Sequence, residues 1–219
     1  MIFIKIKSTV RSHIDRKIAL RSIAAAFVFL AVLNITGFGG RYDSIRENVL
    51  RLHILANSDS AEDQSLKLKV RDAVLLRTDE LFGECENERE AARAAADGLD
   101  MLKAEAERVV KENGYAYGVS ATVCDMWFED RVYDDFTLPA GMYEAVRITI
   151  GEGKGRNWWC VMFPAVCLPS ATKGNRKLGS ILDSSETDMC ENPRRYIAKF
   201  KVVELFEKCR SKLEALSDE

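Results

Sequence analysis

Two residues of the chain have the types that could form a nucleophile and its base. His53 is the only histidine after residue 40, so a Cys-His or Ser-His mechanism in this part of the chain would use it as the base. Cys160 is the candidate nucleophile, with Asp59 or Asp63 orienting the imidazole ring. No nucleophile motif surrounds His53 or Cys160. We therefore predict no catalytic residues, and we keep a thiol hydrolase as the alternative function.

A glycine-rich stretch, Gly151-Glu-Gly-Lys-Gly155, has residue types found in phosphate-binding loops. A P-loop continues with Gly-Lys-Ser/Thr and opens a helix, whereas this stretch precedes a strand pattern over residues 157–163. We predict a hairpin loop, in which the glycines adopt positive φ angles and Glu152, Lys154 and Arg156 are exposed at the tip. No cofactor is predicted.

The six cysteines are of interest if the domain is exported, because an oxidising exterior permits disulfides. Cys160 and Cys167 flank Pro164, and a turn at this proline would bring their Cα atoms within the roughly 5.5 Å that a disulfide needs. The other four, Cys85, Cys124, Cys190 and Cys209, are expected to be small packing residues. Without a Cys-x-x-Cys or His-x-x-x-His pair, no metal site is predicted.

The N-terminus has the pattern of a membrane-targeting segment. Residues 1–21 form a basic leader, and Ser22 to Gly40 are nineteen uncharged residues, which as a helix would span roughly 28 Å. The positive-inside rule predicts a cytoplasmic leader and an extracytoplasmic domain over residues 41–219. Residues 22–40 fit both the core of a cleaved signal peptide and a single transmembrane anchor.

Residues 41–219 have the length and composition of one globular domain. Hydrophobic residues make up 47% of the chain and charged residues 30%, which is typical of a folded protein. The net charge of −2 provides no overall field to attract nucleic acid, so no nucleic-acid partner is predicted.

Four strands are predicted from the hydrophobic pattern. Apolar residues alternate over residues 49–56, and β-branched and aromatic residues are concentrated in 117–128, 143–150 and 157–163. In the last of these, the neighbours Trp158 and Trp159 point to opposite faces of the sheet, so one indole is expected in the core and the other outside.

Helices are predicted where apolar residues recur every three or four positions. One helix starts after Ser60 and continues to about Phe82, and a second runs from about Ala92 to Asn113. A third starts at Asn192-Pro193, and residues 169–192 before it read as a loop. These elements predict an α+β fold: a mainly antiparallel sheet of about four strands packed with two or three helices, after one N-terminal membrane-targeting helix.

Four stretches of sequence together resemble the stage II sporulation protein R family. They are Arg51-Leu-His-Ile-Leu-Ala-Asn-Ser-Asp-Ser60, Gln64-Ser-Leu-Lys-Leu-Lys-Val-Arg-Asp72, Leu138-Pro-Ala-Gly141, and Gly151-Glu-Gly-Lys-Gly-Arg-Asn-Trp-Trp-Cys-Val-Met-Phe-Pro164. The resemblance covers about Val49 to Cys167, and the N-terminal segment lies where this family has an export segment.

The resemblance implies a signalling protein that is not an enzyme. Members are made in the forespore and exported into the space between forespore and mother cell, where they activate a membrane-embedded aspartic protease that processes pro-sigma E. We expect the two dense motifs, Arg51 to Asp59 and Gly151 to Trp159, to face this protease. The candidate partner-binding residues are Arg51, His53, Asn57, Ser58, Asp59, Gly151, Glu152, Gly153, Lys154, Asn157, Trp158 and Trp159.

Overall fold

The structure, a computed structural model, describes residues 16, 18–26, 29, 37–133, 136–164, 179 and 181–205. The chain divides into two compact units, Met1–Arg41 and Tyr42–Glu219. The described residues of the first unit are helical, and the side chains of Ile23 and Phe29 are exposed. No helix among the described residues is both long and apolar enough to cross a membrane. Residues 27–28 and 30–36 of the predicted export segment lie outside the described part.

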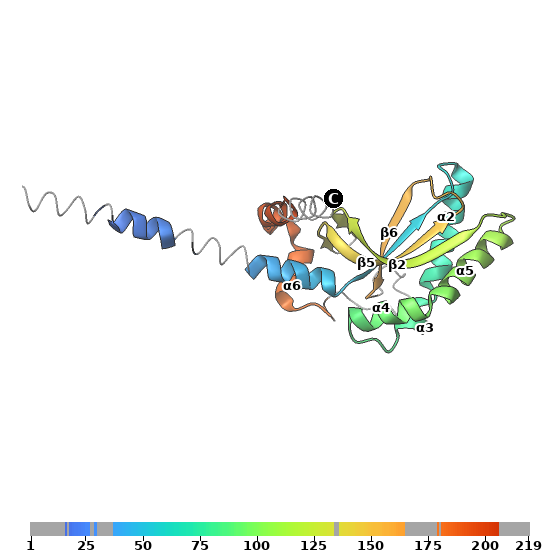
Figure 1. Cartoon of the computed structure of the whole chain (residues 1–219), viewed down its shortest axis with the longest axis horizontal. Coiled ribbons are helices and arrows are strands. Elements are labelled where there is room, and N and C mark those ends of the chain that lie inside the picture. The colour runs from blue at the N-terminus through green and yellow to red at the C-terminus, as the bar shows by residue number, and fades with distance from the viewer. Residues whose placement is uncertain are drawn as a thin grey trace, which may run out of the picture. The chain divides into compact units, whose positions relative to one another are not determined.

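The second unit is built on a four-stranded sheet with the strand order β2-β5-β1-β6 (Figure 1). The bounds are β1 Leu50–Leu55, β2 Val119–Phe128, β5 Gly141–Ile150 and β6 Asn157–Phe163. β2 pairs antiparallel with β5, and β6 pairs antiparallel with β1, while β1 and β5 are parallel. The predicted α+β class and mostly antiparallel four-stranded sheet are therefore confirmed.

One feature of the predicted topology is wrong. β5 and β6 do not form a hairpin, because β1 lies between them and pairs with both. Residues 151–156 instead cross the end of β1, a gap of two strand spacings or roughly 10 Å. All six residues of β1 are buried, as suits a central strand, whereas the sequence pattern had indicated a half-buried one.

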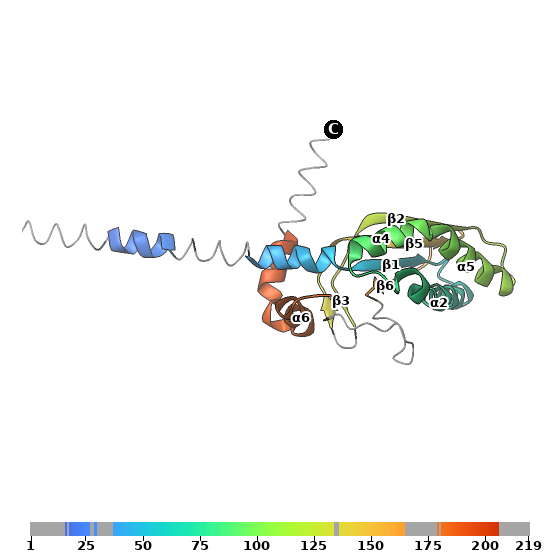
Figure 2. The ribbon, with the colours of Figure 1, turned by 90° about the horizontal axis from the view of Figure 1, so that it is seen from below.

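Four helices pack on one face of this sheet, as the view in Figure 2 shows. They are α2 Ala61–Leu75, α3 Thr78–Phe82, α4 Glu88–Asp97 and α5 Leu99–Glu112. Each of the two helices predicted here is thus divided into two. Ser60 caps α2 as predicted, since its side chain accepts a hydrogen bond from the backbone N–H of Asp63. The second division is at Gly98, where a Cβ would overlap the side chain of Leu81.

The main core lies between the sheet and these helices. Leu52 and Ile54 of β1 and Val146 and Ile148 of β5 are completely buried in it. Burying one such side chain contributes about 1.5–3 kcal/mol to stability. Further core residues from the helices are Leu66, Val70, Val74, Leu102, Ala106 and Val110.

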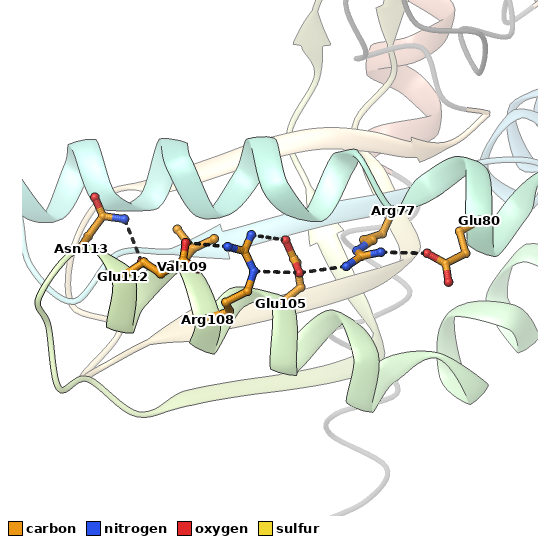
Figure 3. A network of polar contacts seen from close by, with 7 residues as sticks. All are labelled: Arg77, Glu80, Glu105, Arg108, Val109, Glu112 and Asn113. Carbon is orange, nitrogen blue, oxygen red and sulfur yellow. Dashed lines mark hydrogen bonds and ion pairs between the residues drawn. The ribbon is translucent and has the colours of Figure 1, made fainter.

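A chain of ion pairs joins the end of α2 to α5 on the surface (Figure 3). Glu105 of α5 accepts hydrogen bonds from Arg77, at 3.2 Å, and from Arg108, at 2.6 Å. These bonds lower the pKa of the Glu105 carboxyl, the bond from Arg108 having the larger effect. Arg77 also pairs with Glu80 at 3.1 Å, so one network holds the junction of α2 and α3 against α5.

The C-terminal region differs from the prediction. Ser184–Glu191 form the helix α6, within the stretch predicted to be a loop. Asp183 and Glu186 make a capping box at its start, which is a signal that the sequence contains and that we missed. Pro193–Arg195 then form a short 3-10 helix, and residues 197–205 are helical, so the predicted last helix starts later than expected. Residues 206–219 lie outside the described part.

Candidate functional site

The motif residues of β1 divide between the two faces of the sheet. Leu52 and Ile54 point to the helices, and Arg51 and His53 point to the opposite face, which we call the Arg51 face. By the strand register, this face comprises Arg51, His53, Leu55, Ser120, Thr122, Cys124, Met126, Phe128, Tyr143, Ala145, Arg147, Thr149, Asn157, Trp159 and Val161.

Arg51 is a completely buried cation surrounded by aromatic rings. Its guanidinium carbon lies 4.3 Å from the ring centroid of Phe128 and 4.9 Å from that of Tyr143. It donates to the carbonyl oxygen of Cys160 at 3.1 Å and to the hydroxyl of Tyr133 at 2.8 Å, while Nη1 has no hydrogen-bond partner. Burial lowers the pKa of Arg51, because it removes water from the charged form, and no described carboxylate pairs with Arg51.

His53 lies beside Arg51 on the same face and is also buried. Its ring stacks on the indole of Trp159, with centroids 3.9 Å apart. Nε2 is 2.8 Å from Oδ1 of Asn157, and since this oxygen is an acceptor, the ring proton is on Nε2. Burial lowers the pKa of His53, and the charge of Arg147 on the neighbouring strand lowers it further.

The structure does not form the catalytic pair that a thiol hydrolase would need. Cys160 is the register partner of Leu52 and belongs to the core on the helix face, whereas His53 points to the other face. Cys160 is also disulfide-bonded, so its sulfur is not available as a thiolate. Its predicted partner, Cys167, lies outside the described residues, so that pairing stays a prediction.

The remaining cysteines can be compared with the expectation that they are packing residues. Cys85 and Cys190 are buried free thiols, as expected, and Cys124 is free and only half-buried. Cys209 lies outside the described residues. Among the residues that the structure describes, no group of three or more His, Cys, Asp or Glu side chains is placed to hold a metal ion.

The two dense motifs meet at the end of β1, where the 151–156 loop crosses it. The carbonyl oxygens of Ala56 and Asn57 accept hydrogen bonds from the backbone N–H groups of Gly155, at 2.9 Å, and Lys154, at 3.2 Å. The side-chain oxygen of Asn57 accepts a third, from the backbone of Glu152 at 3.0 Å. These bonds hold the loop over the strand end.

Close approach at this crossing explains the glycines of the loop. Gly151 and Gly153 have φ angles of 60° and 62°, as predicted for the loop glycines, whereas Gly155 does not have a positive φ and the loop is not a hairpin. A Cβ at Gly151 would overlap the side chain of Asn57, and one at Gly155 would overlap the carbonyl oxygen of Ser58. Glycine is therefore needed where the loop passes over the 57–58 backbone.

Asp63 of α2 binds the segment that follows β1, at Asn57 and Ser58. Its carboxylate accepts hydrogen bonds from Ser58, at 2.6 Å, and from Asn57, at 2.9 Å. These bonds lower the pKa of Asp63, with the bond from Ser58 as the largest cause. Asp59 accepts from the backbone N–H of Arg156 at 2.7 Å. Three candidate partner-binding residues, Asn57, Ser58 and Asp59, thus bind the protein's own backbone and side chains.

The other candidate residues lie near this crossing. Glu152 and Lys154 are exposed on the loop and pair with each other at 2.7 Å. Trp158 packs against the core on the helix face, with the guanidinium of Arg71 4.4 Å from its ring. Trp159 is on the Arg51 face, so the two indoles do point to opposite sides as predicted.

The four strands separate their charges between the two faces. At strand positions, the Arg51 face carries Arg51, His53 and Arg147 and no acidic residue. The helix face carries Asp125 and Glu144 and no lysine or arginine. Sequence reasoning missed Arg147, although its alternation with Val146 and Ile148 in a predicted strand was available as a signal.

The acidic residues of the helix face affect Glu88, the first residue of α4. Burial and the neighbouring Glu144, with which Glu88 shares a hydrogen bond, raise the pKa of Glu88 to about 7. Asp125 raises it further, and Arg89 opposes the shift. Glu88 is therefore poised to titrate near neutral pH.

Comparisons with known proteins place both motifs in one family. The model of the family described as stage II sporulation protein R matches residues 46–173, which contain β1, the 151–156 loop and β6. Stage II sporulation protein R of Bacillus subtilis (strain 168) is 38% identical over 130 residues, covering 59% of this chain and 58% of that protein. No solved structure is significantly similar to the chain. The chain belongs to the stage II sporulation protein R family.

Proposed function

We propose that this protein is an exported signalling protein that activates a membrane-embedded aspartic protease and so brings about the processing of pro-sigma E. The observation that carries the proposal is the family match over residues 46–173, which includes both dense motifs. The alignment with the Bacillus subtilis relative covers 58% of that protein, so the activity of the whole relative is proposed for this chain.

The arrangement of His53 and Cys160 supports a role other than catalysis. The histidine is buried with its proton directed to Asn157, and the cysteine lies on the other face of the sheet. A surface that is recognised by a partner has to keep its shape, and the hydrogen bonds between the two dense motifs hold them together. We assign the function to a surface of the protein rather than to a catalytic centre.

Export from the forespore to the space between the two cells is the second part of the proposal. The basic leader and the uncharged run from Ser22 to Gly40 fit a signal peptide or a membrane anchor. In the described part of this run, Ile23 and Phe29 expose 68% and 63% of their surface, so these apolar side chains are available to a bilayer.

Co-expression in a non-sporulating host tests the proposal. The protein is produced with the protease and pro-sigma E, and the shortening of pro-sigma E is followed by immunoblot. Processing is expected with the wild type, whereas an active-site aspartate variant of the protease abolishes it. Absence of processing with the wild-type protein would contradict the proposal. Hydrolysis of peptide or ester substrates by the purified domain, abolished by His53→Ala, would favour the thiol hydrolase.

A further inference from the structure

The exposed part of the Arg51 face has the residues of a binding surface, around Arg147. Arg147 is exposed and lies opposite Thr122 on β2 and beside His53 on β1. No described residue forms an ion pair with it. An exposed arginine in the middle of a sheet, without a carboxylate partner among the described residues, leaves its charge available to a partner.

At the strand positions of this face, the residues around Arg147 are either basic or uncharged. Arg51 lies below the surface in the adjacent strand, and among the described residues it has no carboxylate to neutralise it and no hydrogen-bond partner for Nη1. The acidic strand residues Asp125 and Glu144 point to the opposite face. At its strand positions this face therefore carries only positive charge, in a chain whose net charge is −2.

The uncharged neighbours of Arg147 are of the kinds that dominate protein interfaces. Trp159 and Met126 are half-buried on this face, and Thr122 and Asn157 are exposed. Tryptophan and arginine are enriched among the residues that carry binding energy, and methionine is enriched at interfaces generally. Trp159 is held rigid by its stack on His53 and its edge contact with Phe128, at 4.7 Å, so little side-chain entropy would be lost on binding.

We propose that the exposed part of the Arg51 face, centred on Arg147 and Trp159, docks an acidic segment of the partner protein. The inference rests on the proposed function, because it assigns the surface by which the activator contacts the protease. A carboxylate of the partner pairs with Arg147, and an apolar or aromatic side chain of the partner packs on Trp159. This surface is distinct from most of the motif residues, since Asn57 and Asp59 hold the 151–156 loop and Ser58 bonds to Asp63.

An anionic membrane is a different class of partner, and the charges argue against it. Lipid recognition of this kind uses clusters of about four to eight lysines and arginines. The Arg51 face has two arginines at strand positions, and one of them is buried. A few fixed charges beside an aromatic ring suit a specific protein contact better than a charged lipid surface.

A charge reversal with a matched control tests the inference in the full-length protein, in the co-expression assay described above. Arg147→Glu is expected to lower processing of pro-sigma E about tenfold. The new carboxylate repels the carboxylate of the partner, and this repulsion weakens binding by at least about tenfold. Arg93→Glu reverses an exposed arginine of α4, which packs on the helix face, and is expected to change processing less than about twofold. Equal melting temperatures of both variants and the wild type show that the fold is intact.

Restoration and cross-linking identify the occupant. Lysine replacing one acidic residue of the extracytoplasmic part of the protease is expected to restore processing with Arg147→Glu. A photo-cross-linking residue at Thr122 is expected to capture the protease, whereas one at Arg93 is not. Wild-type processing with Arg147→Glu, or cross-links from position 122 to lipid alone, would overturn the inference. Both results leave the proposed function intact, which fails only if the wild type gives no processing.

Discussion

The imidazole of His53 lies flat on the indole of Trp159, with ring centroids 3.9 Å apart and an angle of 4° between the planes. This stack joins one residue from each of the two dense sequence motifs across the β1–β6 pair. It fixes His53 as a buried neutral ring and Trp159 as a rigid platform. The only histidine of the domain therefore supports Trp159 on this face of the sheet and does not form a catalytic pair.

The buried state of His53 predicts a pH dependence of stability. Because burial lowers its pKa in the folded protein, the unfolded chain takes up a proton at a pH where the folded chain does not. This contribution to stability is present above the unfolded pKa of about 6.5 and is lost as the pH falls below it. The melting temperature should therefore fall less between pH 7.5 and 5.5 for His53→Gln than for the wild type. An equal fall in both proteins would show that His53 does not contribute.

Glu88 predicts the opposite trend. Its pKa is raised to about 7, so the folded protein holds a proton that the unfolded chain has released, and the contribution to stability is lost as the pH rises through 7. Glu88→Gln keeps a neutral side chain at every pH. We expect its melting temperature to match the wild type at about pH 4, below the unfolded pKa of 4.5, and to exceed it at pH 8. Glu84→Gln, at an exposed position, is the control and should show no such divergence.

The environment of Arg51 predicts an unusual order of substitutions. Arg51→Lys retains a buried charge but loses the fork that reaches both Cys160 and Tyr133, and we expect a loss of about 3 kcal/mol in the free energy of unfolding. Arg51→Met loses the same bonds and also removes the cost of burying an unpaired cation, so its loss should be smaller. Urea unfolding of both variants measures the order. A larger loss for Arg51→Met would mean that the aromatic rings stabilise the cation more than burial destabilises it.

The crossing of the 151–156 loop over β1 predicts a sharp difference between two glycines. Gly155→Ala places a methyl group on the carbonyl oxygen of Ser58 and should cost about 1–3 kcal/mol, because the backbone on both sides has to move. Gly118 has no atom within 4 Å of its Cβ position and no positive φ angle. Gly118→Ala should be neutral or stabilise by up to about 1 kcal/mol. Similar losses in both variants would contradict the close approach at Gly155.

Local signals in the sequence were enough to predict most of the elements. The alternation in residues 49–56 predicted β1, and Ser60 predicted the start of α2, because a hydroxyl that caps an N–H acts within a few residues. The α6 helix was predictable by the same rule from Asp183 and Glu186. It was missed because apolar residues do not recur every three or four positions around it. The family was predicted from motifs that lie in these same strands, helices and loops.

Other features depended on residues distant in sequence. The hairpin predicted from Gly151 to Arg156 was wrong, because a loop of this length can join adjacent strands or pass over one strand, and the choice depends on where β1 lies. Arg147 could not be assigned to the face of His53 without the parallel pairing of β1 with β5. The same pairing separates the acidic strand residues from the basic ones.

The sequence by itself determined the class of the fold, the positions of the four main strands, the start of α2 and the family, because these follow from periodicity, capping and motif spacing along the chain. Only the tertiary structure decided the order of the strands and which motif residues share a face. Pairing partners are chosen by burial of the whole sheet, which no local pattern encodes. That choice places His53 on Trp159 and away from Cys160, and so turns a candidate catalytic pair into part of a surface.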